Sequence, residues 1–414
     1  MDEAKQKFRL TGLERAWILY DVGNSAFVLL VATLIPIFFN ALAEEGGLSS
    51  VEYLAYWGYA ASAVTVITAV LSPILGTLAD TRNYKKPIFT FCVAVGVIGC
   101  CAMGMASTWL PFLLIFIFAK VGFSGSLVFY DSMLSDVTVP DRMDEVSSKG
   151  YAWGYIGSCV PFVVCLALVL GSSAVGLSQM TALSIALVIT AVWWLVVTLP
   201  LLKKYRQINY VEVEQHAIRQ SFVRIGQTLK HLPQDKQVFW FLLAFFCYID
   251  GVYTIIDMAT AYGTALGLDT TGLLLALLVT QIVAFPSALV FGRLSGQYPS
   301  GTLIPVCIAA YAGIALFAFF LKHQWQFWVL AVVVGMFQGG IQALSRSHFA
   351  KIIPPEKSGE YFGLFDICGK GASFLGTMIV SVGSQLTGSA NVGVGSLIVL
   401  FIVGFVLFRV SDQK

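Results

Sequence analysis

Long apolar stretches separated by short polar gaps fill most of this 414-residue chain. A helix needs about 20 apolar residues to cross the hydrocarbon core of a bilayer. The charge-free runs include Val22 to Ala43, Tyr53 to Ala79, Gly150 to Leu202, Thr270 to Gly292 and Gly371 to Phe408. Two of them are long enough for two helices, or for one helix and part of another. Breaks are expected at Gly171-Ser172-Ser173 and Gly388-Ser389. We therefore predict an all-α membrane protein with about twelve transmembrane helices.

The composition agrees with this prediction. Of the residues, 57% are hydrophobic and 12% are charged, whereas a soluble domain carries about 25% charged residues. Lys and Arg gather in alternate gaps, with Lys322 as the exception. By the positive-inside rule, both termini face the cytoplasm. The first apolar run is too long for a cleavable signal peptide. Short loops and a compact chain favour a bacterial plasma membrane, with a vacuolar membrane second.

One sizeable polar segment divides the chain into nearly equal parts. We expect an N-terminal six-helix half over 1–202, a cytoplasmic linker over 203–235 and a C-terminal six-helix half over 236–414. Apolar residues recur at helical spacing in the linker, at Ile218, Phe222, Ile225 and Leu229. They indicate a basic amphipathic helix on the membrane surface, or else a solvated linker helix. Two six-helix halves with such a linker resemble the major facilitator transporters.

A loop motif strengthens this resemblance. The second predicted helix ends in Gly76-Thr77-Leu78-Ala79-Asp80, and the basic residues Arg82, Lys85 and Lys86 follow. This resembles the loop signature of the major facilitator superfamily, where the aspartate faces a helix N-terminus or an arginine and locks the inner side closed. Asn83 replaces the usual glycine and tolerates a left-handed turn. The equivalent segment of the second half, Gly292 to Gly296, lacks the acid, so we expect a latch on one side only. The alternative is an ordinary basic loop.

Four further segments are similar to the vacuolar effluxer family, the autophagy-related amino-acid exporters and their bacterial relatives. They are Tyr20 to Phe27, Asp250 to Val252, Gly339 to Ser347 and Glu360 to Lys370. Val22-Gly23 departs from the Trp-Ala that is usual in this family. The resemblance implies efflux of small organic solutes, which are amino acids in the fungal case, and it leaves the substrate open.

Ionisable side chains inside membrane spans are costly, so they are usually paired or functional. Here they are Asp21, Lys120, Asp131, Asp250, Asp257, Asp366 and Lys370. Asp366 and Lys370 are four residues apart and can pair. Asp250 has no obvious partner in its own helix, which suits a proton carrier. It could instead bind a substrate amine or pair with Lys370. Arg346 could pair with Asp131 or bind a carboxylate.

Polar and aromatic residues near these charges complete the candidate site. Tyrosines could line a cavity or mark the membrane interface, and glutamines could bind solute or join helices. The candidates for substrate binding or coupling are Tyr20, Asp21, Asn24, Tyr130, Asp131, Tyr248, Asp250, Tyr253, Asp257, Gln338, Gln342, Arg346, Asp366 and Lys370. The candidates for a cytoplasmic gate are Gly76, Asp80, Arg82, Lys85 and Lys86.

Enzyme motifs are absent from the sequence. The four histidines and eight cysteines have no metal-ligand spacing, and there is no phosphate loop or catalytic serine motif. We expect neither an enzyme nor a resident metal or cofactor. The expected partners are a small solute, protons and the lipid bilayer, without nucleic acid, for a monomeric chain. The predicted function is proton-coupled efflux of a small polar or zwitterionic solute by alternating access. The alternatives are uptake or facilitated diffusion, or a non-transporting receptor or lipid-handling protein on the same scaffold.

Overall fold

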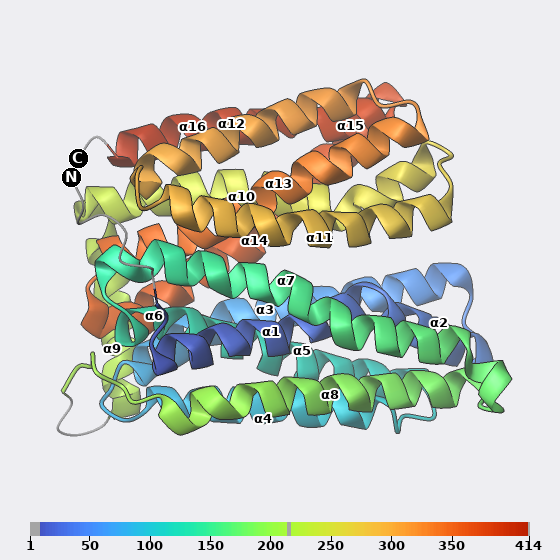
Figure 1. Ribbon diagram of the computed structural model, residues 1–414, viewed down its shortest axis with the longest axis horizontal. Helices are drawn as coiled ribbons and strands as arrows, with labels where there is room; N and C mark the ends of the chain where they lie inside the picture. Colours follow the sequence, from blue (N-terminus) through green and yellow to red (C-terminus); the bar gives the residue numbers. More distant parts are fainter. Residues whose placement is uncertain (1–8, 213–216, 413–414) are drawn as a thin grey trace.

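The computed structural model describes residues 9–212 and 217–412. Within these ranges, the structure describes the backbone alone at residues 50, 51, 54, 217–220, 260, 261, 265, 270, 271, 274 and 370–374. The described chain is almost entirely helical and forms no strand (Figure 1). The prediction of an all-α protein is confirmed.

The membrane-spanning helices form two sets of six. In the N-terminal half they are α1 (Gly12–Ala32) with α2 (Leu34–Glu45), α3 (Ser50–Ala79), α4 (Lys85–Met103), α5 (Trp109–Ser132), α7 (Pro140–Leu170) and α8 (Gln179–Lys204). In the C-terminal half they are α10 (Lys236–Ala265), α11 (Thr270–Leu294), α12 (Ser300–Phe319), α13 (Gln324–Ile352), α14 (Ser358–Thr387) and α15 (Ala390–Gly395) with α16 (Ile398–Asp412). Two short helices, α6 (Leu134–Val137) and α9 (Ala217–His231), lie outside the spans.

The number of spans agrees with the sequence pattern. Eleven stretches among the described residues are long and apolar enough to cross a membrane, and the 30-residue helix α14 supplies the twelfth. Both expected breaks are present, because α7 ends at Leu170 and α14 ends at Thr387. Gly388 adopts a φ of 67° at the second break, a left-handed conformation that glycine adopts without steric cost.

Local sequence signals fix several helix ends. Thr11 and Glu14 form a capping box at the start of α1, and Ser49 and Glu52 form another at the start of α3. Each box satisfies backbone N–H groups that the first helical turn leaves without a partner. Asn83 has a φ of 64° in the turn between α3 and α4, which is the left-handed conformation expected for this position.

The two halves meet along two interfaces. α14 packs on α3, and α7 packs on α11 and α13. Glycine allows the first pair to approach closely, because a side chain at Gly76 would collide with the carbonyl group of Gly359. Both termini, α6 and α9 lie at one end of the bundle (Figure 1). We call it the basic end, since the Lys- and Arg-rich gaps of the sequence gather there, and the opposite end is the far end.

Candidate functional site

The hydrogen bonds and ion pairs that the structure describes between the two halves lie between the basic end and the middle of the bundle. They join Asp80 to Gly359 and Glu360, Lys85 to Ser358, Ser72 to Asp366, Asp144 to Lys351, Ser147 to Ala343, Tyr155 to Gln342, and Arg346 to Asp21, Asp131 and Ser147. The described halves are therefore locked together at the basic end.

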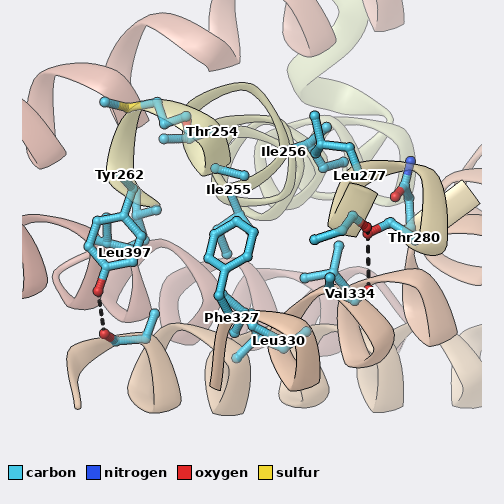
Figure 2. Close-up of a pocket in the computed structure, with 18 of the residues that line it drawn as sticks. Thr254, Ile255, Ile256, Tyr262, Leu277, Thr280, Phe327, Leu330, Val334 and Leu397 are labelled. Atoms are coloured by element: carbon cyan, nitrogen blue, oxygen red, sulfur yellow. Dashed lines mark hydrogen bonds between the residues drawn. The ribbon is translucent and has the colours of Figure 1, made fainter. Parts of the chain in front are cut away.

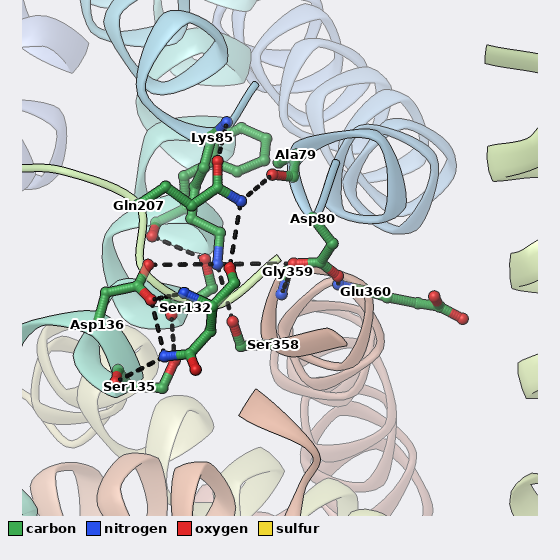
Figure 3. Close-up of polar contacts among 12 residues, drawn as sticks. Ala79, Asp80, Lys85, Ser132, Ser135, Asp136, Gln207, Ser358, Gly359 and Glu360 are labelled. Atoms are coloured by element: carbon green, nitrogen blue, oxygen red, sulfur yellow. Dashed lines mark hydrogen bonds and ion pairs between the residues drawn. The ribbon is translucent and has the colours of Figure 1, made fainter. Parts of the chain in front are cut away.

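Asp80 makes the contact with a helix N-terminus that is predicted for the latch. Its two carboxylate oxygens accept hydrogen bonds from the backbone N–H groups of Gly359, at 2.7 Å, and Glu360, at 2.8 Å (Figure 3). These groups belong to the first turn of α14, where N–H groups have no helical partner and the helix dipole favours a negative charge. Burial raises the pKa of the Asp80 carboxyl to about 6, although Lys85 and the two N–H donors act in the opposite direction.

Lys85 connects this latch to a second acid. Its buried ammonium lies 3.6 Å from Asp80 and 3.8 Å from Asp136 of α6. It also donates a 2.8 Å hydrogen bond to the Ser358 hydroxyl in the other half (Figure 3). Among the three predicted basic residues, Lys85 is therefore the one placed inside the latch. Arg82 is exposed and pairs with Glu212, whereas Lys86 is half-buried.

The chain between α8 and α9 lies against the latch loop. The Val211 N–H group donates to the Asp80 carbonyl at 2.8 Å, and the Gln207 side chain donates to the Ala79 carbonyl at 3.0 Å. Asn209 donates its backbone N–H group to Asp136 at 2.8 Å. The first part of the linker is therefore fixed to the N-terminal half.

The second interface between the halves, where α7 meets α13, is held by an ion pair that the sequence analysis did not predict. Lys351 at the end of α13 pairs with Asp144 near the start of α7, with 2.6 Å between Nζ and Oδ2. The expectation of a latch on one side only therefore needs correction. The aspartate motif is one-sided, but an ion pair secures the second side. The two partners lie 207 positions apart, and no local motif links them.

Arg346 is the centre of a buried cluster. Its Nη1 atom lies 3.0 Å from the Asp131 carboxylate and 3.5 Å from that of Asp21. Its Nε atom donates to the Ser147 hydroxyl at 2.9 Å. Three aromatic rings surround the guanidinium, with centroids 4.3 to 5.4 Å from Cζ, and they belong to Tyr151, Trp17 and Tyr130. Such contacts stabilise a cation away from bulk water. Two carboxylates thus face one guanidinium across the two halves.

Several predicted cavity residues instead pack within their own half. Tyr20 and Tyr248 are fully buried and contact Ser126 and Ser345 through their hydroxyl groups. The Asn24 amide donates to the Tyr20 carbonyl one turn earlier. Of the two roles left open for the candidate tyrosines, lining a cavity is not what Tyr20 and Tyr248 do in this conformation. Tyr130 is also buried, but its hydroxyl donates to Asp21 at 2.8 Å.

Asp250 lies on α10, and its side chain is fully buried against α14. Its Oδ1 atom accepts hydrogen bonds from the Gly376 N–H group at 2.8 Å and from the Thr254 hydroxyl at 3.3 Å. The expectation that Asp250 lacks a partner in its own helix is therefore wrong. Oδ2 has no hydrogen-bond partner among the described residues. The side chain of Lys370 lies outside the described residues, as do its expected pairings with Asp366 and Asp250.

A second pair of charges lies nearer the far end. Asp257 on α10 is exposed, and the charge of Lys120 acts on it. Lys120 lies on α5 of the other half, with its ammonium 4.8 Å from the Phe123 ring centroid. The sequence marked Lys120 as an ionisable residue in a span but did not place it among the site candidates. Tyr253, one turn before Asp257, is half-buried.

One apolar pocket lies inside the C-terminal half (Figure 2). Residues of α10, α11 and α13 form most of its wall, among them Thr254, Thr280 and Phe327. Gln338 also lines it, and its Oε1 atom has no hydrogen-bond partner among the described residues. None of the described residues of the N-terminal half lines this pocket. A site used in alternating access lies between the halves, so this pocket by itself does not meet that requirement.

Comparison with known proteins places the chain among membrane transporters. A family model described as "Vacuole effluxer Atg22 like" matches residues 48–414. The chain is 42% identical over 411 residues to a Bacillus subtilis protein named "Uncharacterized MFS-type transporter YxiO", covering 98% of this chain and 96% of that protein. It is 25% identical over 430 residues to "Autophagy-related protein 22" of Coccidioides immitis, covering 83% and 70% respectively.

Solved structures show the same fold. The human organic anion transporter MFSD10 matches with a TM-score of 0.72 at 13% identity, covering 96% of this chain and 98% of that one. The major facilitator superfamily transporter FucP, in the outward conformation, matches with a TM-score of 0.72 at 17% identity, covering 97% and 98%. The predicted major facilitator fold is confirmed.

Proposed function

Because the chain belongs to the Atg22-like vacuole effluxer family and is a transporter of the major facilitator fold, we propose that it exports a small zwitterionic solute. Amino acids are the first candidates, because they are zwitterions and the family resemblance of the sequence implies them in the fungal case. The transport mode is alternating access coupled to protons, and the membrane is a bacterial plasma membrane, as the Bacillus relative suggests. The division into halves at 1–202 and 236–414 is part of this proposal.

The proposal assigns the basic end to the cytoplasm. The distribution of Lys and Arg supports this orientation. The locked contacts would then close the cytoplasmic side and leave the far end facing outward. Single cysteines at position 47, between α2 and α3, and at position 230, in α9, test this in a cysteine-free background. An impermeant thiol reagent applied to intact cells should label position 47 alone, whereas labelling of position 230 alone would reverse the orientation.

The Arg346 cluster carries the proposal. A zwitterion brings one carboxylate and one ammonium, which can replace the two kinds of charge that the halves now offer each other. The solute carboxylate would bind Arg346, and its ammonium would bind Asp21 or Asp131. The buried charges therefore stay paired when the basic end opens, which lowers the cost of opening.

A buried acid outside the Arg346 cluster supports proton coupling. A zwitterion leaves the charge balance of the cluster unchanged, so the proposed proton site is a separate one. Asp250 is the proposed carrier, because it is buried in a span and its Oδ2 atom accepts no described hydrogen bond. A proton on Oδ2 would remove the cost of a buried charge there.

Transport by the purified protein in liposomes tests the function. Labelled amino acids and uncharged polar solutes of similar size are offered to vesicles with an acidic, neutral or alkaline interior. A proton-coupled exporter should accumulate the zwitterion where the interior is acidic, because protons leave as solute enters. Accumulation in vesicles with an alkaline interior would establish symport. Equal equilibration in all three would establish facilitated diffusion, and preference for the uncharged solutes would refute the assigned substrate class.

A further inference from the structure

The linker helix α9 contacts the basic end of the bundle through one of its faces. Ser221 and Thr228 lie on this face and are buried, whereas Phe222, Val223 and Leu229 on the opposite face are about half exposed. α9 packs against α3 on its buried side. The helix is therefore a fixed part of the basic end, beyond its role in covalently joining the two halves.

Arg224 carries the polar contacts of this buried face. Its Nη2 atom donates a 2.9 Å hydrogen bond to the Thr77 carbonyl of α3. The same atom lies 3.9 Å from the Glu360 carboxylate of α14. The Glu360 side chain is fully buried, and its oxygens accept no hydrogen bond from the described residues. Arg224 is the one ion-pair partner of Glu360 among those residues.

These contacts close a ring of three helices. The Glu360 backbone N–H group binds Asp80 at 2.8 Å, while its side chain faces Arg224. Arg224 in turn binds Thr77, which is one helical turn before Asp80 on α3. The interface between α3 and α14 is thus held twice, once directly through Asp80 and once through α9. The halves can separate here only if both connections break.

We propose that Arg224 is a positioning residue of the gate and that the linker supplies a second latch through it. A buried carboxylate without a positive partner is strongly unfavourable. In the closed state, Arg224 compensates the charge of Glu360, and in the opened state water can do so. Loss of Arg224 should therefore destabilise the closed basic end selectively. This inference rests on alternating access at that end, but not on the solute, the direction of transport or the coupling ion.

A packing role for Arg224 makes a different prediction. If the side chain only fills space, its loss should have the same effect whether or not Glu360 is charged. If it compensates the charge, neutralising Glu360 should remove most of the effect of losing Arg224. A double-mutant cycle separates these two cases. Glu360→Gln is suitable because it retains the backbone N–H group that binds Asp80.

Opening is measured at a position distant from α9. Ser148 of α7 is fully buried against Gly292 of α11, at the other helix interface between the halves. Its hydroxyl has no hydrogen-bond partner among the described residues, so Ser148→Cys should be tolerated in a cysteine-free background. The labelling rate of this cysteine by a maleimide in purified protein reports opening of the basic end. This labelling rate can be measured without a solute and without any transport assay.

Arg224→Met should raise this labelling rate about tenfold, since it leaves a buried charge without its partner. Arg224→Met combined with Glu360→Gln should label within about twofold of Glu360→Gln alone. Lys230→Met removes an exposed charge of the same helix and serves as the matched control, with an unchanged rate. Elution profile and melting temperature confirm folding. If Arg224→Met does not fold, Arg224→Lys replaces it, with an expected rise of about threefold because lysine lacks the planar fork.

Two results would overturn the second latch. One is wild-type labelling in Arg224→Met, and the other is the same fold-increase with and without Glu360→Gln. Both would leave the proposed transport untouched, because that function is measured separately in liposomes. Conversely, a protein that transports no zwitterion could still show the coupled labelling pattern.

Discussion

The Nη1 atom of Arg346 lies 3.5 Å from the Oδ2 atom of Asp21, although 325 positions separate the two residues in the chain. Arg346 belongs to α13 of the C-terminal half, and Asp21 belongs to the first span of the N-terminal half. Their contact therefore exists only while the halves are together at the basic end. Separation leaves a guanidinium and two carboxylates, those of Asp21 and Asp131, that water or a solute must stabilise. The same three charges thus serve to close the gate and to bind a zwitterion in the proposed mechanism.

Arg346→Lys should abolish most transport. Lysine keeps the positive charge but lacks the planar fork that reaches Asp21, Asp131 and Ser147 together. We expect the initial rate in liposomes to fall at least about tenfold with an unchanged melting temperature. Arg293→Lys, an exposed residue at the end of α11, is the matched control and should transport normally. Transport at the wild-type rate in Arg346→Lys would mean that a point charge is sufficient there.

Asp80→Asn should weaken the closed basic end. The amide keeps the size of the side chain, but its nitrogen cannot accept a hydrogen bond from Gly359 or Glu360. Loss of one such bond to a buried donor costs about 1–3 kcal/mol. Distances between spin labels on α3 and α14 should shift toward larger values, and transport should fall several-fold. Arg82→Gln alters an exposed residue of the same loop and should leave both unchanged. Unaltered distances in Asp80→Asn would reduce the motif to a topological signal.

Closure of the basic end should depend on pH through Asp80. Its pKa is raised to about 6 in the closed state, whereas an exposed aspartate has a pKa of about 3.9. Between these values the closed state binds the proton more strongly, so acidification favours closure. Protonation differs from Asp80→Asn because the hydroxyl oxygen of the acid can still accept a hydrogen bond, whereas the amide nitrogen cannot. The contribution is fully present below about pH 4 and is lost as the pH rises through about 6. The spin-label distances should show this trend in the wild type and lose that component in Asp80→Asn. An identical pH profile in both proteins would contradict the assignment.

Charge reversal should test the Lys351–Asp144 pair. Asp144→Lys places two positive charges together and should open the second interface, which is seen as faster labelling of a cysteine at position 148. Lys351→Asp should act similarly through two negative charges. The double reversal restores opposite charges and should return the labelling rate to within about twofold of the wild type. Additive effects of the two substitutions would show that the residues act separately.

Asp250→Asn should separate driven transport from exchange. The amide retains the shape but cannot carry a proton, so accumulation driven by a pH gradient should vanish while solute exchange persists. Thr254→Val removes the hydroxyl that binds Asp250 without touching the carboxylate, and it should keep driven transport. Loss of both activities in Asp250→Asn would indicate substrate binding or a structural role. Intact driven transport would remove Asp250 from the coupling mechanism.

Periodicity and local motifs predicted the parts of the molecule that depend on neighbouring residues. The apolar runs gave the spans, and Gly388 marked a helix break. The Asp80 motif indicated its partner because a helix N-terminus is a general feature that any aspartate can bind. The sequence predicted Asp131 as a possible partner of Arg346 because the spans contain few other charged side chains.

The remaining contacts depend on which helices lie side by side, and periodicity does not encode that. Asp144 and Lys351 each look like ordinary residues of a basic gap, and the ion pair appears only when α7 and α13 meet. Tyr20 and Tyr248 lie beside charged residues in sequence, yet their hydroxyl groups point toward their own halves. Thr254 does not count as an obvious partner of Asp250 in the sequence, because a hydroxyl one turn away carries no charge and does not by itself predict a hydrogen bond.

The two interfaces at the basic end differ in how counter-ions reach them. The bond between Asp80 and α14 is buried and uses backbone dipoles, so dissolved salt has little access to it. Lys351 is 26% exposed in its side chain, and ions in solution can compete for it. We therefore expect rising ionic strength to weaken the contact between α7 and α13 more than the contact between α3 and α14. Because opening requires both interfaces to part, salt alone should raise the labelling rate at position 148 less than loss of the buried contacts of Asp80 or Arg224 does.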